Sequence, residues 1–216
     1  MIENNHKVKG IFKLPGYFLC CLILLCLPLV ICSCATPPKN TKNLCDIFDD
    51  KGGWYKDAKR SYRRWGSPIP VMMSMMHRES SFKRKVKPPR KRILWIIPGP
   101  RPSTAYGYSQ ALESTWTIYK RETGNYGADR DKFKDAIDFI GWYNHKSHRE
   151  CGIKPDNAYA LYLAYHEGQN GFNQGTYKNK TWLKKAANEV ADRAAYYRRQ
   201  LQGCQKRLEG PWWWPF

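Results

Sequence analysis

The stretch "MMHRESSFKRK", residues 75–85, places a glutamate after a run of methionines and shortly before a run of lysine and arginine. The apolar residues before it predict one helix from Pro70 onward, with Glu79 on its apolar stripe. That stripe recurs at intervals of three, four and three residues: Ile69, Met72, Met76 and Glu79. Because a buried carboxylate loses hydration, its pKa rises, which suits a general acid working near neutral pH. The alternative left open by this stretch is a glutamate that ends the helix in solvent or pairs with Arg78 or Arg84.

The first 33 residues have the features of an export signal. The positively charged head contains three lysines: Lys7, Lys9 and Lys13. The uncharged apolar segment "GYFLCCLILLCLPLVI" (16–31) follows, interrupted by Pro28. It is shorter than the roughly 20 residues of a membrane-spanning helix, so a cleaved signal peptide is predicted, with an uncleaved anchor as the alternative.

The end of this segment, Ile31-Cys32-Ser33-Cys34, resembles a bacterial lipobox. Because Ser33 fits the position before the acylated cysteine, Cys34 is the predicted lipidation site. By resemblance to Gram-negative lipoproteins, Ala35 after that cysteine favours the outer membrane. The expected localisation is therefore the bacterial cell envelope, with a lipid anchor in the outer membrane and the folded part facing the periplasm.

Removal of the signal leaves three cysteines besides the lipidated one: Cys45, Cys151 and Cys204. Export permits a disulfide. Cys45 and Cys204 bracket the folded region, one before its first expected helix and one just after its last. We therefore predict that this pair is bonded and that Cys151 is free, although spacing alone does not decide connectivity.

Net charge narrows the possible partners. The whole chain carries +19. Loss of the signal, with its three basic and one acidic residues, leaves 183 residues at +17, enough for a single domain with a core. In an exported lipoprotein this charge favours an anionic surface such as cell wall or lipid headgroups and argues against a nucleic-acid partner. The predicted divisions are a tether (34–44), a folded domain (45–204) and a Trp-rich tail (205–216).

The folded domain is predicted to be mainly α. Apolar periodicity predicts five helices besides the one that carries Glu79: 54–65, 109–122, 131–149, 157–168, and a last helix from Leu183 that stops at Gly203. The 157–168 segment is apolar nearly all round, so we expect it to be the central buried helix. The basic loop 82–104 has room for a short hairpin, and "GQNGFNQGTYKNK" (168–180) has the composition of a polar binding loop.

Three separated motifs resemble one family, the lytic transglycosylases with a goose-type lysozyme fold. "ESSF" (79–82) is similar to its Glu-Ser-x-Phe motif, "YGYSQ" (106–110) to its Gly-Leu-Met-Gln segment, and "AYHEG" (164–168) to its Ala-Tyr-Asn-Ala-Gly segment. The resemblance covers about residues 45–204. It implies a single lysozyme-like domain that cleaves the MurNAc–GlcNAc bond of peptidoglycan glycan strands without a cofactor or metal.

The resemblance also implies roles for individual residues. Glu79 is the expected acid and base, first protonating the glycosidic oxygen and then accepting the proton of the sugar's own 6-hydroxyl, so that a 1,6-anhydro ring closes. Ser80 is expected to orient the Glu79 carboxylate, and Gln110 to line the cleft beside it. Gly107 is expected to allow close backbone approach, and Tyr165 to reach the carboxylate or the sugar.

This sequence departs from the family pattern at two places. Tyr108-Ser109 replaces Leu-Met, and His166-Glu167 replaces Asn-Ala. These changes predict a modified cleft wall, with Tyr108 and Glu167 among the substrate-binding residues. Glu167 serves either as a supporting or structural acid or as the second carboxylate of a lysozyme-type hydrolase.

Two alternatives to a lytic transglycosylase remain open. One is a muramidase that uses Glu79 and Glu167, and the other, in another functional class, is a non-catalytic peptidoglycan-binding or assembly lipoprotein. "HKSH" (145–148) with Cys151 lacks the paired spacing of a strong zinc site and is interpreted as a solvated helix face. The ending "GPWWWPF" (210–216) either packs on the domain, lies at a membrane interface, or binds glycan or an envelope partner.

Overall fold

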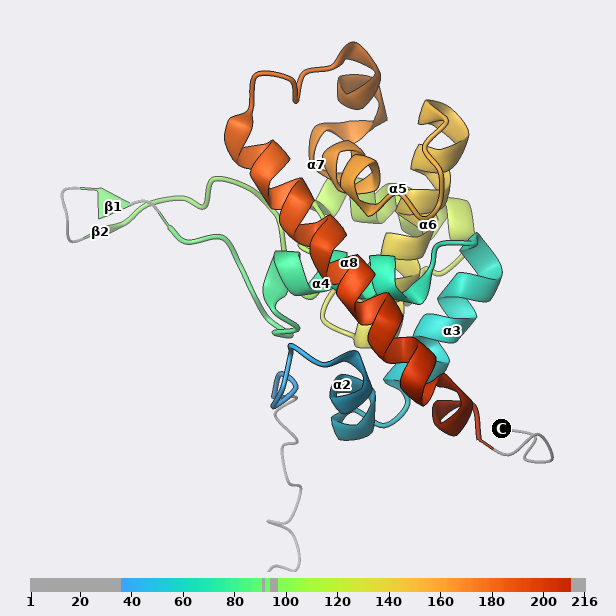
Figure 1. Cartoon of the computed structure of the whole chain (residues 1–216). Helices are drawn as coiled ribbons and strands as arrows, with labels where there is room; N and C mark the ends of the chain where they lie inside the picture. The colour runs from blue at the N-terminus through green and yellow to red at the C-terminus, as the bar shows by residue number, and fades with distance from the viewer. Residues whose placement is uncertain (1–35, 91, 94–96, 211–216) are drawn as a thin grey trace, which may run out of the picture. The chain divides into compact units, whose positions relative to one another are not determined.

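The computed structural model describes residues 36–90, 92–93 and 97–210, and this part of the chain is mainly helical (Figure 1). Its helices are α2 (Leu44–Asp50), α3 (Trp54–Trp65), α4 (Ile69–Ser80), α5 (Glu113–Thr123), α6 (Phe133–Cys151), α7 (Ala158–Gln174) and α8 (Thr181–Leu208). The basic loop contains the expected hairpin, two short antiparallel strands, β1 (Arg92–Ile93) and β2 (Ile97–Pro98), with Ile93 opposite Ile97. The hairpin lies to the side of the helices (Figure 1).

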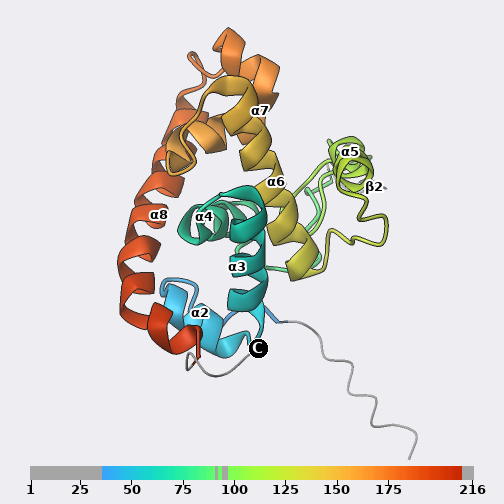
Figure 2. The same cartoon turned by 90° about the vertical axis from the view of Figure 1, so that its right-hand side faces the viewer.

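Helix α4 occupies the centre of the molecule. Figure 2 shows it nearly end-on, surrounded by α3, α6, α7 and α8. Nine of its twelve residues are buried, including a run from Ile69 to Met76, because apolar side chains cover all of its faces. Each fully buried apolar side chain of this size stabilises the fold by roughly 1.5–3 kcal/mol. The expectation that 157–168 would be the central helix was therefore wrong: the first half of α7 is buried, but it packs on α6 and α8.

The helix boundaries differ from the sequence prediction in two informative places. Helix α5 starts at Glu113 instead of 109, because Gln110 adopts φ +50° and Tyr106 pairs with Ala111 in an isolated bridge. Helix α8 does not stop at Gly203 but continues to Leu208. A glycine inside a helix costs only about 0.5–1 kcal/mol relative to alanine, and contacts beyond Gly203 offset that cost.

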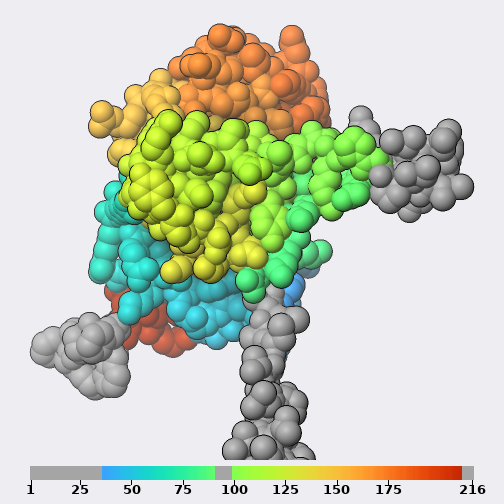
Figure 3. Space-filling model, turned by 180° about the vertical axis from the view of Figure 1, so that it is seen from behind, coloured from blue at the N-terminus to red at the C-terminus, as the bar shows by residue number. Residues whose placement is uncertain are grey.

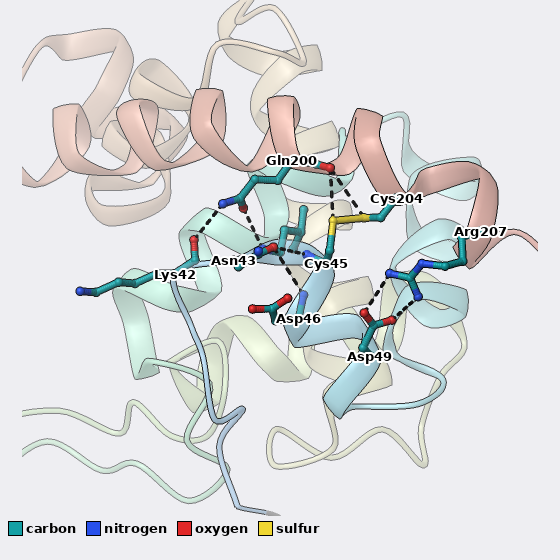
Figure 4. The surroundings of a disulfide bond; sticks show 9 residues. Lys42, Asn43, Cys45, Asp46, Asp49, Gln200, Cys204 and Arg207 are labelled. Carbon is teal, nitrogen blue, oxygen red and sulfur yellow. Dashed lines mark hydrogen bonds and ion pairs between the residues drawn. A yellow bond between two sulfur atoms is a disulfide. The ribbon is translucent and has the colours of Figure 1, made fainter.

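Those contacts join the end of α8 to α2 (Figure 4). Cys45 and Cys204 form a disulfide, the pair that the sequence predicted. Gln200 accepts a hydrogen bond from the Leu44 N–H (2.8 Å), and Arg207 forms a two-pronged ion pair with Asp49 (2.6 and 2.8 Å). Cys45 lies within α2 and Cys204 within α8. Both were predicted to lie just outside the helices, because α2 was not predicted and the last helix was expected to end at Gly203.

The segment just before α2 also packs on the domain. Pro38 is buried, and the Thr41 carbonyl accepts a hydrogen bond from the Tyr197 hydroxyl (2.5 Å). The predicted tether therefore packs on the helical domain, and its last residue, Leu44, begins α2. The first residues of the predicted tail, 205–208, form the end of α8. From behind, α5 and its flanking loops cover the middle of the face (Figure 3).

Several predicted features lie outside the described residues. These are the export signal 1–33, the lipidation site Cys34 and the tail residues 211–216. Within the described part of the chain, no helix is both long and apolar enough to cross a membrane.

Candidate active site

Glu79 lies in the last turn of α4, and the residues of its helical stripe, Met72 and Met76, are fully buried. The helix ends immediately afterwards because Ser81 adopts a left-handed conformation (φ +50°) and its N–H bonds back to the His77 carbonyl (2.8 Å). Glu79 itself is half-buried. Its carboxyl group therefore lies where the core meets the surface.

Burial raises the pKa of Glu79 from 4.5 to about 7. Hydrogen bonding by the Tyr162 hydroxyl and the nearby charge of Arg78 each lower this pKa, but neither cancels the loss of hydration. A pKa near 7 leaves a substantial fraction of the carboxyl protonated at neutral pH. This is the state that a general acid requires.

The two arginines that could have neutralised Glu79 are paired with other groups. The Arg78 guanidinium donates to Glu189 at 2.9 Å. The Arg84 side chain donates to the Asp131 carbonyl at 3.1 Å and lies 3.5 Å from the Asp131 carboxylate. In the structure, neither Arg78 nor Arg84 therefore forms the alternative ion pair with Glu79.

Helix α7 brings two tyrosines toward Glu79. The Tyr165 hydroxyl donates to the Ser109 carbonyl (2.7 Å), and burial, followed by the charge of Glu79, raises the pKa of Tyr165. Tyr162 is the residue whose hydroxyl interacts with Glu79 itself. Sequence reasoning missed Tyr162, although its position three residues before Tyr165 on the same helix face was a usable signal.

Ser80 does not orient the Glu79 carboxylate in the way that we expected. Its buried hydroxyl lies 2.7 Å from the Tyr108 carbonyl and 3.2 Å from the Met76 carbonyl and donates to these backbone groups. It therefore links the end of α4 to the loop at 106–111.

Gly107 allows a close backbone approach, but the approach is to another part of this chain. Gly107 has φ +79°, and a Cβ at this position would collide with the backbone carbonyl of Arg130. The adjacent Tyr108 N–H donates to that same carbonyl (3.1 Å), and the Gly107 N–H donates to Val86 (3.0 Å). The glycine is thus required for the loop to pack on its neighbours.

Gln110 is half-buried in the same loop, with its side-chain nitrogen donating to the carbonyls of Val86 (3.0 Å) and Gly107 (2.8 Å). Its amide braces the loop, and its role beside the cleft stays a prediction. Tyr108 is a correction: its side chain is only 3% exposed and packs edge-on against Trp54 and Phe133. It belongs to the core, not to a substrate-binding surface.

Glu167 is a second correction. Burial acts to raise its pKa, but hydrogen bonds from Lys180, Thr176 and His166 outweigh that effect and lower the pKa to about 2. Lys180 contacts both carboxylate oxygens of Glu167, at 2.8 and 2.7 Å, and the Glu167 side chain is only 5% exposed. Glu167 is thus an ionised carboxylate with a buried side chain, and it holds Lys180 and Thr176 by hydrogen bonds. This engagement disfavours the muramidase alternative, which needs a free second carboxylate.

The histidines considered as a metal site bind the backbone instead. The Nδ1 atom of His145 lies 3.2 Å from the Trp65 carbonyl, and that of His148 lies 2.7 Å from the Ile153 carbonyl. Cys151 directs its thiol toward the Gln169 carbonyl (3.6 Å). Among the residues that the structure describes, no cluster of three histidine, cysteine or acidic side chains is arranged to hold a metal ion.

Comparison with known proteins gives one match. A family model described as "Transglycosylase SLT domain" matches residues 21–204, which span every helix from α2 to α7 and most of α8. The matched range includes Glu79, the loop at 106–111, and Tyr162 and Tyr165 of α7. The searches of curated proteins and of solved structures found no match.

Proposed function

This chain belongs to the transglycosylase SLT family, and we propose that it is a lytic transglycosylase that cleaves the MurNAc–GlcNAc β-1,4 bond of peptidoglycan with Glu79 as its single acid/base. The observation that carries the proposal is the position of Glu79 in the last turn of α4, on the buried stripe of that helix, where burial raises the pKa of its carboxyl. Peptidoglycan glycan strands are the substrate that the family implies.

The proposed reaction uses one carboxyl group twice. Protonated Glu79 gives its proton to the glycosidic oxygen as the bond between that oxygen and C1 of MurNAc breaks. The resulting carboxylate then accepts the proton of the MurNAc 6-hydroxyl, whose oxygen bonds to C1 and closes a 1,6-anhydro ring. Glu79 ends protonated, and no water is consumed.

The surroundings of Glu79 favour this chemistry over hydrolysis. A hydrolase with two carboxyl groups places them about 5–10 Å apart, one as an acid and the other free to act as a base or nucleophile. Glu167, the acid considered for the second role, has its oxygens occupied by Lys180, Thr176 and His166. After burial, the groups that shift the pKa of Glu79 are the Tyr162 hydroxyl and the Arg78 guanidinium.

Product identity tests the reaction. The full chain, purified in a non-ionic detergent, is incubated with purified peptidoglycan, and the soluble products are identified by mass spectrometry. We expect muropeptides that end in 1,6-anhydroMurNAc. Reducing-end MurNAc products would contradict the proposal and indicate a hydrolase, and an absence of products with retained wall binding would support the non-catalytic alternative.

We expect Tyr162→Phe to shift the alkaline limb of the pH–activity profile upward. The Tyr162 hydroxyl favours the charged form of Glu79 and lowers its pKa, so its removal raises that pKa and keeps the acid protonated to higher pH. The profile is measured beside Tyr159→Phe, a matched change one turn earlier on α7. If the alkaline limbs of the two variants coincided, Tyr162 would not be the residue that lowers the pKa of Glu79.

We also propose that Cys34 is lipidated after cleavage of residues 1–33 and that the lipid anchors the domain in the outer membrane, facing the periplasm. The lipobox-like sequence and Ala35 support this proposal. The intact mass of the chain extracted from membranes of a Gram-negative host should correspond to residues 34–216 plus the lipid, and Cys34→Ser should abolish the lipid mass. An intact mass that includes residues 1–33 would instead indicate an uncleaved anchor.

A further inference from the structure

Trp182 is an exposed aromatic residue that the proposed chemistry does not use. It lies in the first turn of α8, where that helix packs beside α7, and 57% of its surface is exposed. Its ring stands edge-on to the ring of His166 on α7, with the centroids 4.9 Å apart and the planes at 75°. Tryptophan combines a large apolar face with a polar N–H, and such residues are enriched at binding interfaces.

The pair lies next to the candidate active site along α7. His166 follows Tyr162 by four residues, so the two share one helix face and lie about 6 Å apart along the axis. Tyr162 is the buried residue that interacts with Glu79, whereas His166 is exposed. One face of α7 therefore carries both Tyr162, which interacts with Glu79, and His166, which contacts Trp182 at the surface.

Trp182 is anchored on both sides, although it is exposed. Two residues earlier, Lys180 is held by both oxygens of Glu167, and Thr176 donates a hydrogen bond to the same carboxylate. One residue later, Leu183 is completely buried. The position of Trp182 is therefore set by the fold before any ligand arrives, which lowers the entropic cost of binding.

We propose that His166 and Trp182, here called the α7–α8 aromatic pair, form a stacking platform for a saccharide ring of the glycan strand, next to the two rings whose glycosidic bond Glu79 cleaves. This inference rests on the proposed function for its ligand. The apolar C–H face of a pyranose ring covers the exposed indole, while the ring hydroxyls stay available to polar groups and water.

Binding to a catalytically blocked chain tests the platform. The full-length Glu79→Gln chain is titrated with chitohexaose, a neutral β-1,4-linked GlcNAc oligomer, by calorimetry and by NMR of the tryptophan indole N–H signals. We expect the Trp182 signal, assigned by its loss in Trp182→Phe, to shift on binding. We expect Trp182→Ala in this background to weaken binding by about three- to tenfold, and Trp182→Phe, which keeps an aromatic face, to weaken it less.

Tyr196→Ala is the matched control. Tyr196 is also exposed, at 50%, on the same helix, but it lies fourteen residues further along, about 21 Å at the α-helical rise. We expect this variant to bind chitohexaose as tightly as its Glu79→Gln parent. Thermal melts of all variants verify that they remain folded.

The failure of this inference is distinguishable from failure of the proposed function. The platform is overturned if Glu79→Gln does not bind the oligomer, or if Trp182→Ala binds as tightly as the Tyr196→Ala control, whatever the wild-type chain cleaves. Binding that depends on Trp182, combined with no cleavage products from the wild-type chain, supports the platform and overturns the proposed reaction instead. In an active chain, Trp182→Ala should raise KM with little change in kcat.

Discussion

Glu79→Gln is expected to reduce the rate of peptidoglycan cleavage by about 10²–10⁴-fold, the usual contribution of a general acid/base. Glutamine has the size of glutamate but cannot donate a proton to the glycosidic oxygen or accept one from the 6-hydroxyl. The rate is measured from the release of soluble muropeptides. Glu167→Gln is the matched control: because Glu167 holds Lys180 and Thr176 by hydrogen bonds, we expect loss of stability but no comparable loss in the chemical step. A folded Glu167→Gln chain without activity would contradict this account and favour the muramidase alternative.

Glu79→Gln should also change the free energy of unfolding, by an amount that depends on pH. The folded-state pKa of Glu79, about 7, lies above its ordinary 4.5, so ionisation opposes folding as the pH rises between these values. Above pH 7 the whole penalty is present, on the order of 3 kcal/mol. Glu79→Gln removes it, so the variant should be more stable than the wild type at pH 8.5 and similar to it at pH 4. Chemical denaturation at both pH values measures the difference.

Loss of the disulfide is expected to have the largest effect on stability. Replacing Cys45 and Cys204 with serine opens a link between residues 159 apart in sequence, and removal of a native disulfide typically costs about 2–5 kcal/mol. For a domain of this size the melting temperature should fall by roughly 4–20 °C. Hydrogen exchange should accelerate first in α2, which the disulfide, Gln200 and Arg207 hold against α8.

Cys151→Ser is the control for that experiment, because Cys151 is a free cysteine and half-buried. We expect it to change the melting temperature much less. Reduction of the wild-type chain should reproduce the double-serine result. An unchanged melting temperature after complete reduction would show that the ion pairs and packing around α2 suffice without the covalent link.

The sequence predicted the features that depend on one local pattern. The period of α4 placed Glu79 on the buried stripe, and the cysteines that bracket the domain indicated the disulfide that the structure contains. Helix α2 was missed because seven residues are too few for a periodic signal. The end of α8 was misplaced because the contacts that carry it past Gly203 come from residues about 160 positions away.

The direction of a side chain was harder to predict than its place in a motif. Tyr108 and Glu167 occupy motif positions for which the sequence predicted substrate binding. Tyr108 instead packs in an aromatic cluster with Trp54 and Phe133, and the Glu167 carboxylate contacts Lys180. Both outcomes depend on partners in other elements. Tyr162 escaped notice for the same reason, because its interaction with Glu79 joins two helices that are distant in sequence.

The pKa of the Glu79 carboxyl tests the central claim most directly. It can be measured by NMR titration of the chain labelled with ¹³C at glutamate side chains, with the Glu79 signal assigned by its absence in Glu79→Gln. We predict a midpoint near pH 7, because burial raises the pKa and Tyr162 and Arg78 only partly offset it. A midpoint near the ordinary 4.5 would mean that Glu79 is hydrated and ionised at neutral pH, and would contradict its role as the general acid.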